Sequence, residues 1–218
     1  MNPKFRTSVY IDGHNLYNNI RRMYESNDTP YDQAKWREVL WLDLLKLSQS
    51  FLNPTQELIS VKYFTARVTK PKSKVKRQSI YIDALKSLDK LEVIEGKYHD
   101  NNPVECQHCH QIFYVSKEKQ TDVNLATALL VDVIEDKIDT AYIVSVDSDY
   151  KAPLSYIRIK YPQKRIYFEF VETNFSYTLA RSSYRPYIIY RERLLKCQLP
   201  ETITLPSGFV VQRPAMWK

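Results

Sequence analysis

Glycine is scarce in this sequence: Gly13, Gly96 and Gly208 are the only three among 218 residues. A Walker phosphate-binding loop needs two glycines in a short frame before Lys-Ser/Thr, and a dinucleotide-binding fingerprint needs three. Glycines this far apart can build neither motif. If the protein handles phosphates, it must do so with metal ions or with basic side chains.

Long apolar runs are also lacking. Residues 1–6 lead directly into a short apolar segment, and no stretch is long enough for a signal peptide or a membrane span. The three cysteines are an odd number, and no secretion signal accompanies them, which argues against a disulfide framework. We therefore expect a cytoplasmic protein in a reducing setting, with no membrane association.

The composition is that of an ordinary globular chain, with 44% hydrophobic and 26% charged residues. Its length suits one domain with a real core. The formal net charge of +7 favours a polyanionic partner such as nucleic acid. Seventeen tyrosines are available to pack in the core or to stack on bases.

Short apolar runs alternate with amphipathic stretches along the chain. Strands are expected at 8–11, 58–64, 91–95, 140–145 and 165–170. Helices are expected at 16–23, 36–51, 77–91, 121–134 and 153–161, with loops at 27–30 and 68–75. This alternation predicts an α/β fold with a mainly parallel central sheet flanked by helices.

One domain accounts for the whole pattern. Residues 1–173 carry the alternating elements, with an irregular insertion, or a hairpin, near 97–117. Residues 174–218 follow as one helix and a wrapping tail of the same domain. In such folds the functional site lies beyond the carboxyl ends of the parallel strands.

Aspartates follow two of these strands. Asp12 ends the first, Asp147 and Asp149 follow the fourth, and Asp122 begins the helix before it. Each has a simpler explanation as a helix cap or turn residue. Carboxylates gathered at one sheet edge repel one another unless a cation bridges them, and Mg²⁺ or Mn²⁺ prefers oxygen ligands. Together they predict a metal site that acts on phosphodiesters.

Three segments resemble the motifs of NYN domains, in the LabA-like branch of the PIN-like nucleases. The opening, middle and late motifs are Tyr10-Ile11-Asp12-Gly13-His14-Asn15-Leu16, Thr121-Asp122-Val123-Asn124-Leu125-Ala126 and Ser145-Val146-Asp147-Ser148-Asp149-Tyr150. The resemblance extends from about residue 7 to residue 170. It implies a three-layer PIN-like (Rossmann-like) fold over 1–173 and RNA hydrolysis with Mg²⁺ or Mn²⁺.

The resemblance also implies roles for individual residues. The metal-site acids match Asp12, Asp122, Asp147 and Asp149, and Asn15 matches a polar residue that supports them or touches the substrate. Val146 stands where the family commonly has glycine, and its larger side chain is expected to narrow the approach to the metal and slow catalysis. Thr121 replaces a more usual apolar residue.

Three functions compete at this point. The first is a metal-dependent ribonuclease, in which metal-activated water attacks phosphorus and leaves a 5′-phosphate and a 3′-hydroxyl. The second is a catalytically weak or inactive RNA- or nucleotide-binding module with a regulatory role. The third, an aspartyl phosphatase, is disfavoured because the first strand is followed by Asp12-Gly13-His14 and not by Asp-x-Asp.

A basic segment follows the second strand, on the presumed site edge. The candidate RNA-binding residues are Tyr63, Arg67, Lys70, Lys72, Lys74, Lys76 and Arg77. The cations would grip phosphates and Tyr63 would stack a base, most readily in single-stranded RNA. A solvated loop is the alternative. The sequence gives no oligomeric state.

Cys106 and Cys109 form a CxxCH string that ends in His110. Haem attachment needs export, and the context of a thioredoxin-like pair is not clear. The pair supplies half of a tetrahedral Zn²⁺ site, with His99, His108 or His110 as candidate further ligands. Cys197 is isolated in the sequence. Zinc is therefore a lesser expectation than magnesium or manganese.

Overall fold

The computed structural model describes residues 3–25, 32–172 and 174–218. The loop expected at 27–30 lies outside these residues. A seven-stranded sheet has the order β4-β3-β2-β1-β5-β6-β7, and every neighbouring pair is parallel except β3 and β4. The strands are β1 (Phe5–Asp12), β2 (Gln56–Ala66), β3 (Leu91–Glu105), β4 (Ile112–Lys119), β5 (Thr140–Val144), β6 (Arg165–Val171) and β7 (Pro186–Ile189).

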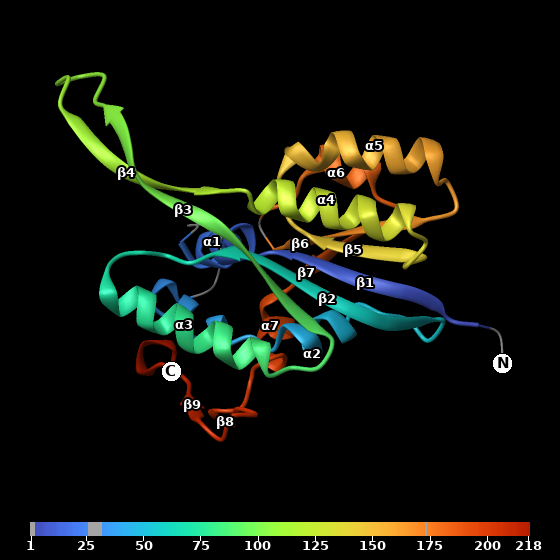
Figure 1. Ribbon diagram of the computed structural model, residues 1–218, viewed down its shortest axis with the longest axis horizontal. Helices are drawn as coiled ribbons and strands as arrows, with labels where there is room; N and C mark the ends of the chain where they lie inside the picture. Colours follow the sequence, from blue (N-terminus) through green and yellow to red (C-terminus); the bar gives the residue numbers. More distant parts are fainter. Residues whose placement is uncertain (1–2, 26–31, 173) are drawn as a thin grey trace.

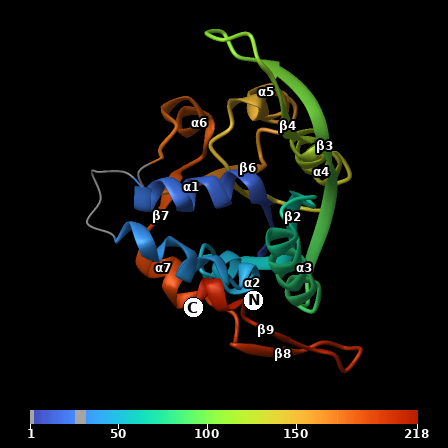
Figure 2. The same cartoon turned by 90° about the vertical axis from the view of Figure 1, so that its left-hand side faces the viewer.

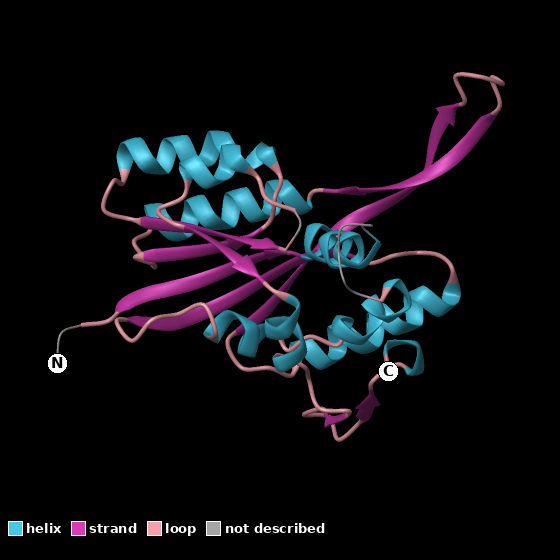
Figure 3. Ribbon diagram, turned by 180° about the vertical axis from the view of Figure 1, so that it is seen from behind, coloured by secondary structure: helices cyan, strands magenta, loops and turns pink. Residues whose placement is uncertain are grey.

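Helices cover both faces of this sheet (Figure 1). One face carries α4 (Thr121–Ile134), α5 (Lys151–Lys160) and α6 (Tyr177–Ser182). The other carries α1 (Gly13–Glu25), the 3-10 helix η1 (Gln33–Leu40), α2 (Leu44–Gln49), α3 (Lys72–Lys86) and α7 (Arg191–Lys196). The view from behind gives the same three layers (Figure 3). The predicted α/β fold with a mainly parallel sheet is confirmed.

The strands alternate between the two cores because successive side chains point to opposite faces. In β1, Val9 and Ile11 pack in the core beneath α1, whereas Tyr10 packs in the core beneath α4. All three are fully buried. Burial on both faces explains why the strands read as continuous apolar runs.

Two predicted elements begin or end elsewhere. The single helix expected at 36–51 is wrong, because Asp43 breaks it by capping α2 through the Lys46 amide at 2.8 Å. The loop expected at 68–75 ends early, since α3 starts at Lys72 directly after Pro71. The Gln78 side chain fixes this junction by accepting from the Val68 amide at 2.8 Å.

Of the two alternatives for the insertion near 97–117, irregular chain or a hairpin, the structure shows the hairpin. Within it β3 and β4 continue as an antiparallel hairpin that reaches far out of the body (Figures 1 and 2). Gly96 stands at its base, where a Cβ would lie 2.6 Å from the Lys119 carbonyl oxygen. The close approach of the two strands there explains the glycine.

The segment after residue 173 holds more than one helix. It contains α6, β7 and α7, and then a two-stranded sheet of β8 (Thr202–Thr204) and β9 (Val210–Gln212), followed by a 3-10 turn, η3 (Ala215–Trp217). The Trp41 indole donates to the Pro200 carbonyl at 2.8 Å, and the ring of Trp217 lies 6.2 Å from that of Trp41. Aromatic contacts thus hold the tail against the body.

No helix in the described part of the chain is long and apolar enough to cross a membrane.

Candidate active site

The first predicted aspartate stands where β1 turns into α1. Asp12 ends the strand and Gly13 begins the helix without a linking loop. A Cβ at Gly13 would lie 2.6 Å from the Tyr63 ring, so only glycine fits beneath that ring. This turn delivers Asp12 to the carboxyl edge of the sheet.

Asp12 is a buried carboxylate, with 3% of its surface exposed. It accepts hydrogen bonds from the Asn15 amide at 2.9 Å and from the Ser145 hydroxyl at 3.2 Å. Burial raises its pKa to about 6, and the nearby charge of Asp122 acts in the same direction. The two hydrogen bonds do not offset the loss of water.

Tyr150 links this carboxylate to the second one. Its buried hydroxyl lies 3.3 Å from Asp12 Oδ2 and donates to Asp122 Oδ1 at 2.9 Å. Burial and the adjacent carboxylates raise the pKa of this phenol well above its usual value. The hydroxyl therefore stays protonated and fixes the positions of the two carboxylates relative to each other.

The remaining aspartates lie beside Asp122. Ligand oxygens of Asp122, Asp147 and Asp149 all lie within 4.8 Å of one another, with Asp147 half-buried and the other two exposed. Asp147 caps the 3-10 turn η2 (Ser148–Tyr150) by accepting from the Asp149 amide at 2.9 Å. The cap fixes the backbone that carries both carboxylates.

Asn15 connects the two loops of the site. Its side-chain oxygen accepts from the Val146 amide at 3.1 Å and from the Asn19 amide group at 2.6 Å. The Val146 side chain packs against the core beneath α4 and does not line the acidic pocket. The position that commonly holds glycine in the family is therefore occupied without narrowing the pocket.

Glu118 is a fifth acid that the sequence reasoning missed. It is the last residue but one of β4, its carboxylate lies 3.2 Å from the His14 imidazole, and it accepts a hydrogen bond from the Thr121 hydroxyl. The contact also accounts for Thr121, where the family has an apolar residue. The only sequence signal for Glu118 is its position three residues before Thr121. This spacing points to the site only when the path of the hairpin is known.

These side chains surround an open acidic pocket of about 430 Å³. Its walls include Asp12, Asn15, Glu118, Asp122 and Asp147, and the cations Arg22 and Lys119 also line it. None of the four aspartates forms an ion pair with lysine or arginine among the residues that the structure describes.

The donor set fits a divalent cation. Two oxygens bound to one Mg²⁺ at about 2.1 Å lie at most about 4.2 Å apart, and the aspartate oxygens, all within 4.8 Å of one another, would reach this separation by small side-chain rotations. The raised pKa of Asp12 marks a carboxylate that a bound cation would stabilise in its charged form. Asp122, Asp147 and Asp149 would hold the ion, with Asp12 behind them.

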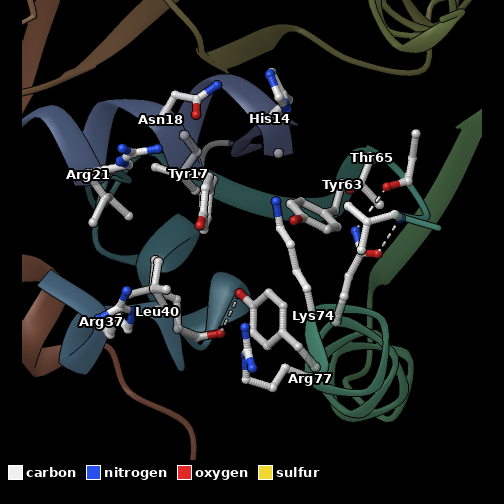
Figure 4. Close-up of a pocket in the computed structure, with 18 of the residues that line it drawn as sticks. His14, Tyr17, Asn18, Arg21, Arg37, Leu40, Tyr63, Thr65, Lys74 and Arg77 are labelled. Atoms are coloured by element: carbon white, nitrogen blue, oxygen red, sulfur yellow. Dashed lines mark hydrogen bonds between the residues drawn. The ribbon is translucent and has the colours of Figure 1, made fainter. Parts of the chain in front are cut away.

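A second cavity of about 220 Å³ adjoins this pocket (Figure 4). His14, Asn18, Tyr98 and Glu118 line both spaces. The second cavity lies between α1, η1 and α3, and Trp217 of the tail closes one side. Acidic and basic regions thus meet across a shared wall.

The structure separates the predicted RNA-binding residues into groups. Lys74, Arg77 and Tyr63 line the second cavity. Tyr63 is only 8% exposed and packs edge-on against Tyr81, so little of its ring faces solvent.

The remaining predicted cations lie outside both spaces. Arg67 makes a two-pronged ion pair with Glu95, at 2.6 and 3.0 Å, and so its guanidinium is engaged within the fold. Lys70, Lys72 and Lys76 are exposed, with the latter two in the first turns of α3.

Cys106 and Cys109 lie at the far tip of the β3–β4 hairpin. Backbone amides of Cys109 and His108 donate to the Cys106 sulfur and lower its pKa. His110 instead contacts Glu105 at 2.6 Å, and the His99 side chain lies outside the described residues. Within the described chain, the pair belongs to no group of three metal-ligating side chains.

Comparisons with known proteins agree with this architecture. A family model described as NYN domain matches residues 6–185. A curated protein named 6-hydroxy-3-succinoylpyridine 3-monooxygenase, from Pseudomonas putida (strain DSM 28022 / S16), is 32% identical over 188 residues. That match covers 70% of this chain and 55% of the curated protein, so the chain spans about half the length of this relative.

A solved structure is also similar. It is a protein of unknown function from Vibrio parahaemolyticus RIMD 2210633, with a TM-score of 0.56 and 18% sequence identity. The match covers 87% of this chain and 95% of that chain. At this identity the likeness supports the fold alone.

Proposed function

The chain belongs to the NYN domain family, within the PIN-like nucleases, and from this premise we propose that it is a metal-dependent ribonuclease. It would hydrolyse phosphodiester bonds of RNA at the aspartate cluster on the carboxyl edge of the sheet. The single observation that carries the proposal is this cluster: three carboxylates within 4.8 Å beside a fourth that is buried, none of them ion-paired with lysine or arginine among the residues that the structure describes.

The unneutralised charge is what makes the cluster useful. Crowded carboxylates disfavour one another unless a cation is present, and Mg²⁺ or Mn²⁺ is the hard ion that oxygen ligands select. When bound, such an ion supplies Lewis-acid activation of water and neutralises charge at phosphate. The net charge of +7 then serves to attract the polyanion.

The chain's own residues have positioning roles in this proposal. The Tyr150 hydroxyl keeps Asp12 and Asp122 facing the same point. Asn15 connects α1 to the loop that carries Asp147, and the Ser145 hydroxyl accepts a hydrogen bond from the Asp147 amide at 3.1 Å. The ligand oxygens are therefore held in place before any substrate arrives.

The alternative, an RNA-binding module without hydrolysis, was suggested in the sequence by Val146. Because this side chain packs against the core, it does not obstruct the acidic pocket. The name of the curated relative describes an oxygenase, and this chain spans about half of that protein. We therefore keep hydrolysis as the proposed activity.

The test is cleavage of end-labelled single-stranded RNA with Mn²⁺. Three arms accompany the parent: the Asp147→Asn variant, an EDTA control, and the Asp89→Asn variant, which changes an exposed aspartate outside both pockets. We expect cleavage by the parent and by Asp89→Asn only, leaving a 5′-phosphate and a 3′-hydroxyl.

Two results would contradict the proposal. A 2′,3′-cyclic phosphate product would rule out attack by water on phosphorus. RNA binding that is equal in the parent and Asp147→Asn, without cleavage by either, would favour the binding module.

A further inference from the structure

The second cavity has a composition of its own. Three of its cations, Arg37, Lys74 and Arg77, come from η1 and α3. No carboxylate in the described part of the chain lies within ion-pair distance of any of them. By contrast, Arg21 on the rim is paired with Glu25 at 2.7 Å.

The three cations have weak partners instead. Arg37 lies over the Trp36 ring at 5.0 Å, and Lys74 over the Tyr17 ring at 5.5 Å. The Arg77 guanidinium reaches the Met216 sulfur at 3.2 Å, which is a poor acceptor. Lys74 extends from α3 to a position between the rings of Tyr17 and Tyr63 (Figure 4). Such contacts are weaker than charge-assisted hydrogen bonds to an anion, so the cations remain available to one.

Aromatic side chains form much of the remaining wall. The half-buried Tyr17 meets Trp36 edge-on, with ring centroids 5.4 Å apart, and Tyr81 meets Trp217 in the same way at 5.7 Å. Flat apolar walls favour a planar ring, and the cations favour a negative group attached to it. A nucleotide combines the two features.

We propose that this cavity binds one nucleotide of the RNA chain, adjacent to the phosphodiester at the aspartate cluster. The position in the polymer rests on the proposed ribonuclease function, whereas binding of the nucleotide rests on the cavity alone. At about 220 Å³ the cavity is smaller than the roughly 300–1,000 Å³ of drug-sized ligand sites. This volume limits the cavity to one base at most, with its phosphate at the open mouth, and leaves no room for a stacked run.

A base can enter such a cavity only after it leaves the stack of its neighbours. The site would consequently accept single-stranded RNA and discriminate against the interior of a duplex. Because Trp217 closes one side, the tail would be part of the substrate site and not only of the fold.

The first experiment measures binding without cleavage. AMP, GMP, CMP and UMP are titrated in EDTA into the full chain, with tryptophan fluorescence as the readout because Trp36 and Trp217 line the cavity. We expect at least one mononucleotide to bind about tenfold more tightly than inorganic phosphate or its own nucleoside, since ring and anion contacts act together.

Variants then locate the binding. Lys74→Met keeps the apolar stem and removes the charge, Arg77→Ala removes a second cation, and Lys160→Ala removes an exposed lysine on α5. The first two should each weaken mononucleotide binding about tenfold, as expected when a charged hydrogen-bond donor is lost. The control should leave it unchanged. A thermal melt establishes that each variant is folded.

Cleavage kinetics separate this proposal from the ribonuclease itself. If the parent cleaves RNA, Lys74→Met and Arg77→Ala should raise KM with little change in kcat. If nothing cleaves RNA but the two variants still lose mononucleotide binding, the cavity proposal stands and the ribonuclease fails.

Three outcomes would overturn the cavity proposal. One is that no mononucleotide binds more tightly than inorganic phosphate. Another is that binding is unchanged in both Lys74→Met and Arg77→Ala. The last is that nicotinate, an aromatic anion without ribose or phosphate, binds as tightly as the best mononucleotide and loses that binding in the same variants.

Discussion

Aspartates at the two edges of the central sheet differ in whether a basic side chain is paired with them. At the amino edge, Arg6 holds Asp139 with two side-chain hydrogen bonds at 2.8 and 3.0 Å, and Lys164 contacts Asp136. These contacts lower the pKa of Asp139 to about 2. At the carboxyl edge, Asp12 has no such partner among the described residues, and burial raises its pKa to about 6.

The difference separates structural acids from available ones. A carboxylate paired with arginine at the protein surface joins segments of the fold, and its charge is already balanced within the protein. A buried carboxylate among others reduces stability unless something external neutralises it. Under the proposed function, the carboxyl edge would give up some stability of the free protein and gain affinity for a divalent ion.

The largest expected difference between the two edges comes from replacing one carboxyl group with an amide at each edge. Asp12→Asn should lower RNA cleavage about a thousandfold, a barrier increase of roughly 4 kcal/mol, because a charge at the reaction site is lost. Asp139→Asn should leave cleavage unchanged. Cleavage rates of the folded variants in Mn²⁺ check both expectations, and equal losses at the two edges would undo the contrast.

Glu169, within β6, isolates the effect of burial, since no ion pair to it is found among the described residues and the charge of Arg193 only partly opposes the effect. Burial raises its pKa from 4.5 to about 8, and one carboxyl oxygen has no hydrogen-bond partner. Between pH 4.5 and about pH 8, Glu169 is protonated in the folded chain and ionised in the unfolded chain. The free energy of unfolding should therefore fall as pH rises through this range. Relative to a pH below 4.5, the free energy of unfolding at pH 7 should be lower by about 3 kcal/mol.

Glu169→Gln should remove this loss. Urea unfolding of the parent and the variant at pH 5 and pH 7.5 compares the two slopes. A parent whose stability changes no more than that of Glu169→Gln would contradict the proposed burial effect.

Metal binding should act on one edge only. Mn²⁺ at about ten times its dissociation constant should stabilise the chain by roughly 1.4 kcal/mol, which raises Tm by about 3 to 5 °C for a chain of this size. The shift should vanish in Asp147→Asn and persist in Asp136→Asn. Thermal melts with and without Mn²⁺ supply the comparison, and a shift retained in Asp147→Asn would place the ion elsewhere.

The smallest effect concerns stability without metal. Asp139→Asn should destabilise the chain by about 1 kcal/mol, because the Arg6 pair is partly exposed and partly screened. Asp12→Asn should leave stability unchanged or raise it, since it removes a buried charge. Urea unfolding in EDTA measures both, and a larger loss in Asp12→Asn would reverse the assignment of the two edges.

Sequence predicted those features that depend on local pattern and strand direction. The apolar runs predicted five of the strands, and the carboxyl ends of parallel strands predicted the edge where Asp12, Asp147 and Asp149 lie. Asp122 was predicted at the same edge from its place at the start of α4. Glu118 was missed because its position depends on the extended hairpin, where the apolar residues Ile112, Phe113 and Tyr114 are exposed and mark no buried face. The hydrophobic signal is weak where a strand packs against nothing.

The tail illustrates a second limit. The short strand β7 pairs with β6, and Trp217 meets Trp41 across most of the chain length. Such contacts arise from the folded surface and leave no periodic trace in the sequence. The second cavity was likewise hidden, since its lining combines α1, η1, α3 and this tail.

The position of Trp217 has a practical consequence for handling the protein. An affinity tag appended after Lys218 would begin one residue from the wall of the second cavity. A tag placed before Phe5 would lie at the opposite edge of the sheet, beside the Arg6 ion pairs. Purification through the amino terminus therefore leaves the cavity clear for titration.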